Sequence, residues 1–220
     1  MTIHDDDPSS DPRPPTRVAP AFDPRPVTLE GRIVRLEPLT LDHLPGLAEV
    51  ADDPETWRWT RGSVPDGAAL RRYVDEALSG AATGRDIPFV QVDRTTGRPI
   101  GMTRFTAIER AHRRLEIGYT WLAAPWRGGG TNSESKLLLL TQAFDGWGAN
   151  RVEFKTDALN ARSRAALRAI GATEEGTLRR HIVTDAGRVR DSVYFSIVWD
   201  EWPEVRARLA LRLSRVMDVR

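Results

Sequence analysis

The sequence predicts one α+β domain built on a mixed, mainly antiparallel central sheet. Three segments with strand patterning follow one another between residues 87 and 122, as expected for an antiparallel meander. A glycine-rich loop, an amphipathic helix and a further strand come next, and a hairpin and a last helix complete the chain. With 220 residues, 40% of them apolar and 29% charged, the chain is ordinary for a globular protein of one or at most two domains.

Composition excludes several classes of protein. The chain has no cysteine, which removes disulfides, thiolate zinc sites, iron–sulfur clusters and a cysteine nucleophile. The net charge is 32 − 31 = +1, so a dedicated nucleic-acid binder is not expected. Of the 32 basic residues all but Lys136 and Lys155 are arginine, which we interpret as GC-rich coding bias. No apolar run reaches the ~18 residues of a membrane span, and Asp5–Asp7 stand where a signal peptide would be basic, so we expect a cytoplasmic protein.

The first 26 residues differ in composition from the rest. Residues 1–26 hold seven prolines and five aspartates, and they have few apolar residues to offset the entropy of ordering. We therefore expect residues 1–26 to be a disordered tail and residues 27–220 to form the single domain.

The first half of the domain reads as a strand, two helices and the meander. Alternating apolar residues indicate the first strand, Thr40 is a plausible N-cap for the first helix, and Gly80 is expected to end the second. In chain order the elements are a strand at 33–38, a helix at 40–50, a loop with Trp57 and Trp59, a helix at 67–78, and strands at 87–92, 100–108 and 115–122.

The second half begins with the glycine-rich loop at 127–132. The following helix has apolar residues at helical spacing from Leu137 to Trp147 and ends at Gly148. A strand at 152–156 precedes a short helix with Asn160 as its N-cap and Gly171 just beyond its end. A hairpin of strands at 176–184 and 188–199 and a helix at 201–216 follow.

The glycine-rich loop has the construction of a phosphate site. Gly128, Gly129 and Gly130 let the backbone approach a ligand, and the helix that follows offers free N–H groups and the positive end of its dipole. Arg127 and Lys136 add positive charge nearby, so the loop suits a diphosphate. A glycine run alone is as compatible with a flexible connection. Neither the Walker pattern nor the dinucleotide fingerprint is present.

With its neighbouring motifs, this loop resembles a known family. Arg127-x-x-Gly130-x-Asn132 resembles the acyl-CoA pyrophosphate loop of the GNAT N-acetyltransferase superfamily, although Asn132 stands where that motif has Gly or Ala. Residues 132–137 are similar to the Asn-x-Glu-Ala-Lys-Leu run of its ribosomal-protein-alanine N-acetyltransferase branch. Asn160-x-x-Ser163 resembles the second cofactor motif of that branch, and residues 179–196 resemble its C-terminal hairpin.

The resemblance implies transfer of an acetyl group from acetyl-CoA to an amine, which is either a protein N-terminal α-amine or a small molecule. It implies that the fourth and fifth strands, 115–122 and 152–156, splay apart. The pantetheine arm would lie in that gap, bonded to backbone near Thr120, Trp121 and Leu122. The diphosphate would be bound by residues of the loop, which are Arg127, Gly128, Gly129, Gly130, Thr131 and Asn132. Four scattered histidines suggest no metal site. The oligomeric state stays open, a homodimer included.

Two residues are candidates for the base that takes a proton from the acceptor. Glu116 shares a strand face with the small residues Gly118 and Thr120, which suits a cleft, although a salt bridge with an arginine is an equal alternative. His181 has an ordinary pKa near ~6.5, suited to base catalysis, but a surface histidine on a strand is the simpler interpretation.

The remaining candidates lie around these two. Asn160 caps a helix and, in the family, contacts pantetheine. Ser163 could protonate the leaving thiolate, as proposed in the branch, or bond only to backbone, and Tyr194 is a weaker alternative acid. Trp57 and Trp59 belong to a loop that forms an acceptor wall in the family, and we expect one of them to pack in the core. The hairpin region carries arginines that could form a basic rim, although solvated surface is the simpler interpretation for most: Arg113, Arg114, Arg179, Arg180, Arg188 and Arg190.

Two other functions compete with an enzyme. One is a non-catalytic acyl-CoA-binding regulatory module, which would keep the loop and lose the catalytic groups. The other is an RNA- or ribosome-associated binding protein using the basic rim, which the net charge of +1 disfavours. Glu116, Asn160 and Ser163 are all present, which favours the acetyltransferase.

Overall fold

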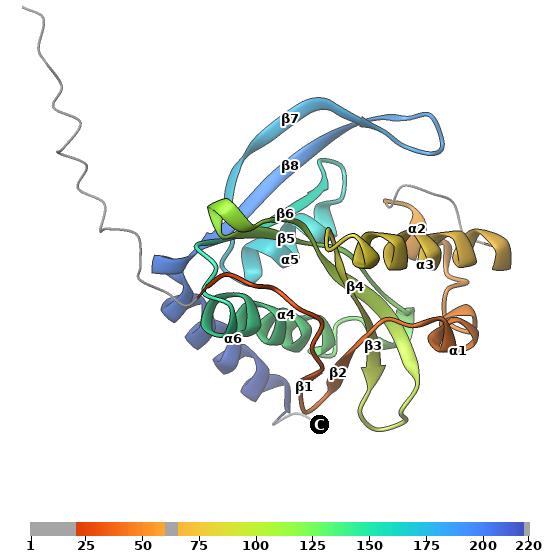
Figure 1. Ribbon diagram of the computed structural model, residues 1–220, viewed down its shortest axis with the longest axis horizontal. Coiled ribbons are helices and arrows are strands. Elements are labelled where there is room, and N and C mark those ends of the chain that lie inside the picture. Colours follow the sequence, from red (N-terminus) through yellow and green to blue (C-terminus); the bar gives the residue numbers. More distant parts are fainter. Residues whose placement is uncertain (1–20, 60–65, 218–220) are drawn as a thin grey trace, which may run out of the picture.

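A computed structural model describes residues 21–59 and 66–217 of the chain (Figure 1). A single eight-stranded sheet runs through it in the order β1-β2-β3-β4-β5-β6-β8-β7. The strands are β1 (Leu29–Glu30), β2 (Val34–Pro38), β3 (Ile87–Asp93), β4 (Pro99–Glu109), β5 (Arg114–Leu122), β6 (Arg151–Asp157), β7 (Thr173–Val183) and β8 (Val189–Val198). All neighbours pair antiparallel except β5 and β6, so the predicted mixed, mainly antiparallel sheet is confirmed.

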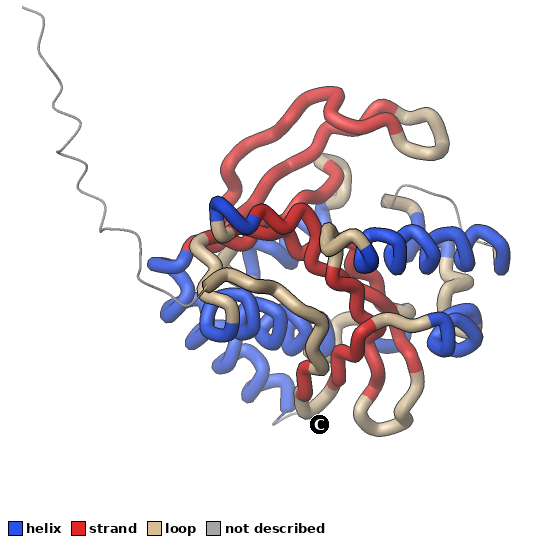
Figure 2. Tube along the Cα trace, in the orientation of Figure 1, coloured by secondary structure: helices blue, strands red, loops and turns tan. Residues whose placement is uncertain are grey.

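Helices cover both faces of this sheet (Figures 1 and 2). One apolar core joins the sheet to α4 (Thr131–Thr141), α5 (Ala161–Ala169) and α6 (Trp202–Met217). A second core on the opposite face joins it to α1 (Leu44–Ala48), α2 (Pro54–Trp57) and α3 (Gly67–Ala82). In the part of the chain that the structure covers, no helix is both long enough and apolar enough to cross a membrane.

The central strands separate after a short parallel contact. β5 and β6 pair only from Arg114 to Glu116 and from Arg151 to Glu153, although both strands continue beyond. The predicted splay of these two strands is therefore confirmed. The C-terminal parts of β5 and β6 are left without each other's hydrogen bonds, and α4 follows β5 after a 3-10 turn at Ala124–Trp126 and the glycine-rich loop (Figure 1).

The two outer strands of the sheet are irregular. β1 has only two residues. The pairing of β7 with β8 shifts register between Glu174 and Gly176 and again between Leu178 and Ile182, and Arg180 within the second shift has a φ of 52°. β7 and β8 form the long hairpin that projects from the sheet in Figure 1.

The boundary of the predicted tail is wrong at its C-terminal end. Phe22 is only 8% exposed and belongs to the core that α4 and α6 share, and Pro24 is buried as well. The prediction followed the proline- and aspartate-rich composition of residues 1–26 and gave too little weight to the aromatic side chain of Phe22. Residues 1–20 lie outside the described residues, so disorder there stays a prediction.

Several helix boundaries differ from the predictions for local reasons. Residues 40–50 form a 3-10 turn at Leu41–His43 and then the five-residue α1 rather than one helix. Asp53 caps α2, which was predicted as loop. Gly80 lies inside α3 rather than after it, and glycine is required there because a Cβ would collide with the Asp86 carboxylate. After α4 a π-helical turn covers Gln142–Gly146.

The burial of Phe22 generates a stability prediction. Deleting residues 1–26 should lower the melting temperature, whereas deleting residues 1–20 should not. Phe22→Ala alone should cost roughly 3–5 kcal/mol, the usual range for a buried phenylalanine. Thermal unfolding of the three variants against the full chain checks this, and equal melting temperatures for the two deletions would contradict it.

Candidate active site

The glycine-rich loop forms the N-terminus of α4. Gly128 and Gly130 have φ values of 79° and 90°, which only glycine adopts at little cost, and Gly130 is the N-cap of the helix. Within the residues of known structure, the amides of Gly128, Gly129 and Gly130 donate to no other group. The first amides of any helix also lack helical acceptors. The loop therefore presents a run of free N–H donors that fits a diphosphate.

Glu134, in the first turn of α4, fixes this loop against the sheet. Its buried carboxylate accepts three backbone N–H bonds, from Arg32 at 2.9 Å, Ile33 at 2.7 Å and Val34 at 2.8 Å. A Cβ on Gly31 would collide with the same carboxylate, so glycine is required there. Glu134 lies in the quoted motif, but its partners are about a hundred residues away, and no local pattern identifies them.

Arg127 does not point to the loop it precedes. Its guanidinium pairs with Asp53 at 2.7 Å, bonds to Thr56 and donates from Nε to the Leu122 carbonyl at 2.9 Å. The expected contribution of its charge to the diphosphate site is therefore not supported. Arg127 instead ties α2 to the end of β5.

A bulge deforms β5 at the point where the strands separate. Tyr119 has a φ of 53°, and the pairing with β4 shifts register between Gly118 and Trp121. The shift turns the Trp121 side chain into the core under α1–α3. The buried Arg104 lies 3.7 Å from the centre of the Tyr119 ring and pairs with Asp86 at 3.3 Å, which holds the bulge from that side.

The carbonyls that follow the bulge are bonded within the protein. Gln91 donates from Nε2 to the carbonyl of Trp121 at 3.0 Å and of Met102 at 3.1 Å, and its Oε1 accepts from Ser135 of α4 at 2.6 Å. With Arg127 on the carbonyl of Leu122, two of the three residues predicted to bind the pantetheine arm through backbone, Trp121 and Leu122, have their carbonyls occupied. At these two positions a bound pantetheine arm would therefore need to bond to groups of β5 other than the carbonyls.

Glu116 lies at the last residue of the parallel contact between β5 and β6. It is 6% exposed, and its Oε2 lies 3.2 Å from Nζ of Lys155 on β6. Burial raises the pKa of Glu116, and the Lys155 ammonium opposes that shift. A carboxylate with a raised pKa suits proton transfer near neutral pH. The predicted salt bridge exists, but its cation is a lysine rather than an arginine.

His181 reaches the same face of the sheet from the hairpin. Its ring stacks edge-on with Tyr194 at 5.7 Å, and Lys155 Nζ lies 5.8 Å from the centre of the Tyr194 ring. Desolvation, then the charges of Lys155 and Arg190, lower the pKa of His181. The structure thus brings both base candidates and Tyr194 into one cluster around Lys155, a residue to which the sequence analysis gave no role.

Asn160 and Ser163 form the N-terminal turn of α5, directly after β6. The Asn160 Oδ1 accepts from the backbone N–H of Ser163 at 2.9 Å, so the predicted helix cap is confirmed. Ser163 is half-buried. The turn is held by Asp157, whose Oδ1 accepts from the Leu159 N–H at 2.9 Å. Pantetheine contact and acid catalysis by these residues stay predictions.

The two tryptophans separate as expected. Trp57 is buried and donates from Nε1 to the Ala51 carbonyl at 2.7 Å. Trp59 is half-buried, with the Arg188 guanidinium 6.0 Å from the centre of its ring. Trp59, just beyond the end of α2, therefore lies near the β7–β8 hairpin.

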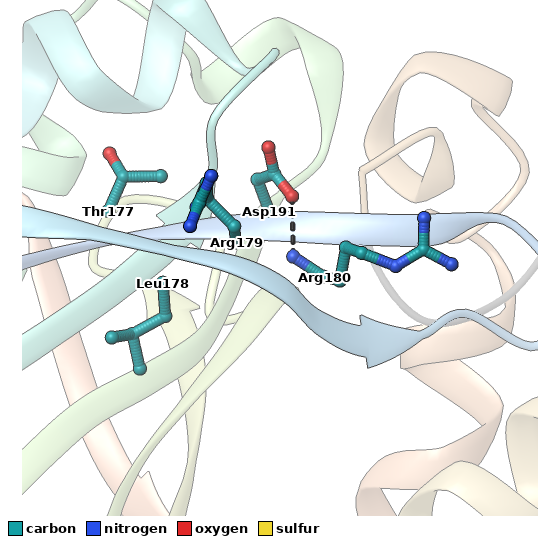
Figure 3. A pocket seen from close by; sticks show the side chains of 5 residues that line it. All are labelled: Thr177, Leu178, Arg179, Arg180 and Asp191. Atoms are coloured by element: carbon teal, nitrogen blue, oxygen red, sulfur yellow. Dashed lines mark hydrogen bonds between the residues drawn. The ribbon is translucent and has the colours of Figure 1, made fainter.

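The arginines of the predicted basic rim do not form one patch. Arg113 donates to the Gly148 carbonyl, Arg114 pairs with Glu153 at 3.3 Å, and Arg188 pairs with Asp157. Only Arg179 and Arg180 line an open hollow of about 620 Å³ on the hairpin, with Thr177, Leu178 and Asp191. Figure 3 shows Thr177 and Arg179 on one side of β7 and Leu178 on the other. The Arg180 amide donates to Asp191 there at 2.6 Å.

Lys136 is the unexpected member of the site. Its side chain turns inward from α4 and is 5% exposed, and Nζ donates to the Thr120 hydroxyl of β5 at 2.9 Å. Nζ also lies 5.9 Å from the centre of the Phe154 ring on β6. Burial lowers the pKa of Lys136 to about 7. The residue predicted to add charge to the loop therefore faces the gap between β5 and β6.

A sheet that opens beside a glycine loop on a helix N-terminus, with a buried carboxylate at the opening, is the arrangement expected of an acyl-group transferase. Comparison with known proteins agrees. The family model described as "Acetyltransferase (GNAT) domain" matches residues 34–173, and the chain belongs to this family of acyltransferases.

Three similar proteins illustrate the relationship. YdaF of Bacillus subtilis (strain 168), whose name assigns it provisionally to the ribosomal N-acetyltransferases, is 34% identical over 70% of this chain and 76% of its own length. A crystal structure from T. thermophilus, provisionally described as an acetyltransferase, is 38% identical with a TM-score of 0.78 over 86% of this chain and 98% of its own. Mycobacterium smegmatis RimJ, solved with CoA-disulfide, is 25% identical with a TM-score of 0.74 over 85% of this chain and 95% of its own.

The buried lysine predicts an unusual pH dependence of stability. Because its pKa is lowered to about 7 in the fold, the unfolded chain binds the extra proton between about pH 7 and the ordinary lysine value of ~10.4. Stability should therefore rise with pH across that interval. Lys136→Met should raise the melting temperature at pH 6.5 and lose most of this advantage at pH 10.

Thermal unfolding at both pH values measures the effect. Lys155→Met is the matched control, because its cation has the partner Glu116 and its removal should give no such gain. A Lys136→Met variant that is less stable than the parent at pH 6.5 would contradict the prediction.

Proposed function

We propose that the protein transfers the acetyl group of acetyl-CoA directly to an amine, in the cleft where β5 and β6 separate. The observation that carries the proposal is the conjunction of the free amides of Gly128–Gly130 with Glu116 at the point of separation. The loop would bind the diphosphate with the amides of Gly128 to Asn132 and the α4 dipole. The arm would then extend along the gap toward Glu116.

In this proposal Glu116 takes the proton that the acceptor ammonium must lose, directly or through water. Its burial keeps its proton affinity high enough for this, and Lys155 holds the carboxylate in position. His181 and Tyr194 extend the cluster toward the hairpin and could pass the proton to solvent. Asn160 and Ser163 border the gap from α5, where the Ser163 hydroxyl is the predicted acid for the leaving sulfur.

The acceptor class stays as predicted, a protein N-terminal α-amine or a small-molecule amine. The names of YdaF and RimJ support the first alternative, and Trp59 and the exposed hairpin give a peptide a surface to lie against. A thiol-release screen with peptides beginning with Ala or Ser, polyamines, aminoglycosides and amino acids tests the two alternatives. We propose that the protein acts in the cytoplasm.

The loop assignment predicts the effect of a charge at Gly128. A Cβ on Gly128 meets no atom within 4 Å, and Asp and Asn tolerate a positive φ about equally well. Gly128→Asp should therefore weaken CoA binding at least about tenfold more than Gly128→Asn, a difference of about 1.4 kcal/mol or more. Calorimetric titration with CoA measures both. Equal affinities would place the diphosphate elsewhere.

The base assignment predicts a loss of rate without a loss of binding. Glu116→Gln keeps the shape of the side chain and should lower kcat by about 10²–10⁴-fold, with little change in acetyl-CoA affinity. The loss should shrink at high pH, where more of the acceptor is already neutral. His181→Gln is the paired control. Full activity of Glu116→Gln and loss in His181→Gln at pH 7 would move the role to His181.

A further inference from the structure

The chain uses lysine only at the cleft. It has 32 Lys and Arg residues in total, and only Lys136 and Lys155 are lysines. Lys155 on β6 contacts Glu116, and Lys136 on α4 contacts Thr120 on β5. Arginine stays charged at every accessible pH, whereas a buried lysine can give up its proton. Both lysines therefore lie where β5 and β6 separate. At that place a side chain that can release a proton is suited to proton transfer.

Lys136 has no counter-ion among the residues whose positions are described. Its only polar partner within them is the neutral Thr120 hydroxyl, and the Phe154 ring is its other close neighbour. An ammonium has three N–H donors, so two are unused. Glu134, the nearest carboxylate along α4, is occupied by the three amides of β2 and its preceding turn. Burying a cation without a neighbouring anion costs free energy. The Lys136 ammonium is therefore suited to a ligand that brings negative charge to this position.

Lys136 and Glu116 approach neighbouring residues of β5, Thr120 and Gly118, from opposite faces. Leu115 and Ile117 belong to the core on the α4 side, so Glu116 between them points to the other face. The Glu116 carboxylate lies 2.9 Å from the position of a Cβ on Gly118. From the α4 side, the Thr120 hydroxyl that Lys136 contacts lies 3.5 Å from the Gly118 carbonyl. The base thus lies against Gly118 on one face of β5, and the cation contacts Thr120 on the other.

We propose that Lys136, rather than Ser163, is the catalytic residue that protonates the CoA sulfur as it leaves. This inference rests on the proposed function, because it needs the thioester in the gap. The acceptor amine would lose its proton on the face of β5 that carries Glu116. The sulfur would leave on the opposite face, which Lys136 approaches. The arrangement separates the base from the acid, so that neither neutralises the other.

The step balances without a further reactant. Glu116 accepts one proton from the attacking ammonium, and the nitrogen lone pair forms the C–N bond. The electron pair of the C–S bond passes to sulfur, and Lys136 donates one Nζ proton to give the free thiol. Water then returns a proton to the neutral Lys136 amine. Before the proton moves, a thiolate beside the Lys136 ammonium favours the ionised form of both groups, so the pKa of the thiol falls and that of the lysine rises.

The test compares CoA with dethio-CoA, in which hydrogen replaces the thiol, on the full chain and on Lys136→Met. In the parent protein, the ultraviolet absorbance of the thiolate should show that bound CoA ionises at lower pH than free CoA. In Lys136→Met this shift should disappear. Calorimetry should show that dethio-CoA binds both proteins equally, and kcat should fall about 10²-fold or more in the variant. Ser163→Ala is the matched control and should leave the thiolate shift intact.

Each outcome has one interpretation. Equal thiolate titrations in the parent protein and Lys136→Met overturn the proposal, as does a thiolate shift lost in Ser163→Ala and kept in Lys136→Met. Equal weakening of CoA and dethio-CoA by Lys136→Met also overturns it, because the lysine would then bind another part of the arm. Failure of both ligands to bind the parent protein would instead overturn the proposed function.

Discussion

The carboxylate of Glu134 is the constraint on which the site depends. Three amides of the turn and strand around Ile33 converge on it, and the same residue lies in the first turn of α4, four positions after the glycine cap of the helix. Hydrogen bonds to a charged acceptor are stronger than neutral ones, and this group is buried. The start of α4 is thereby fixed relative to the edge of the sheet, and in the described part of the chain the amides of Gly128, Gly129 and Gly130 stay free for a ligand.

A second buried network fixes the other side of the gap. Gln91 connects the carbonyls of Met102 on β4 and Trp121 on β5 to Ser135, one residue after Glu134. Helix α4 is thus bonded to β2 through one residue and to β3, β4 and β5 through the next. On one side of the gap, β2, β3, β4 and β5 are therefore all attached to the same helical turn, directly or through Gln91.

The sequence predicted what depends on local pattern. Strand alternation, caps such as Asn160, and the glycine loop were recognisable because each is specified by neighbouring residues. Contacts between segments far apart in the sequence were not recognisable in this way. Nothing near Arg127 indicates that its guanidinium turns to Asp53, and nothing near Lys136 indicates that it turns away from the loop into the sheet. The lysine partner of Glu116 was missed for the same reason, because it lies on another strand.

The irregular edges of the sheet bear on how copies of this protein can meet. A flat, exposed terminal strand is a template on which another chain can extend the sheet. Here β1 offers only two residues, and β7 is broken by two register shifts, a left-handed arginine and a run of charged side chains. Neither edge provides a continuous ladder of donors and acceptors. The open sheet that the cleft requires is therefore compatible with a protein that stays dispersed at high concentration, and any association of copies would depend on side chains rather than on shared strands.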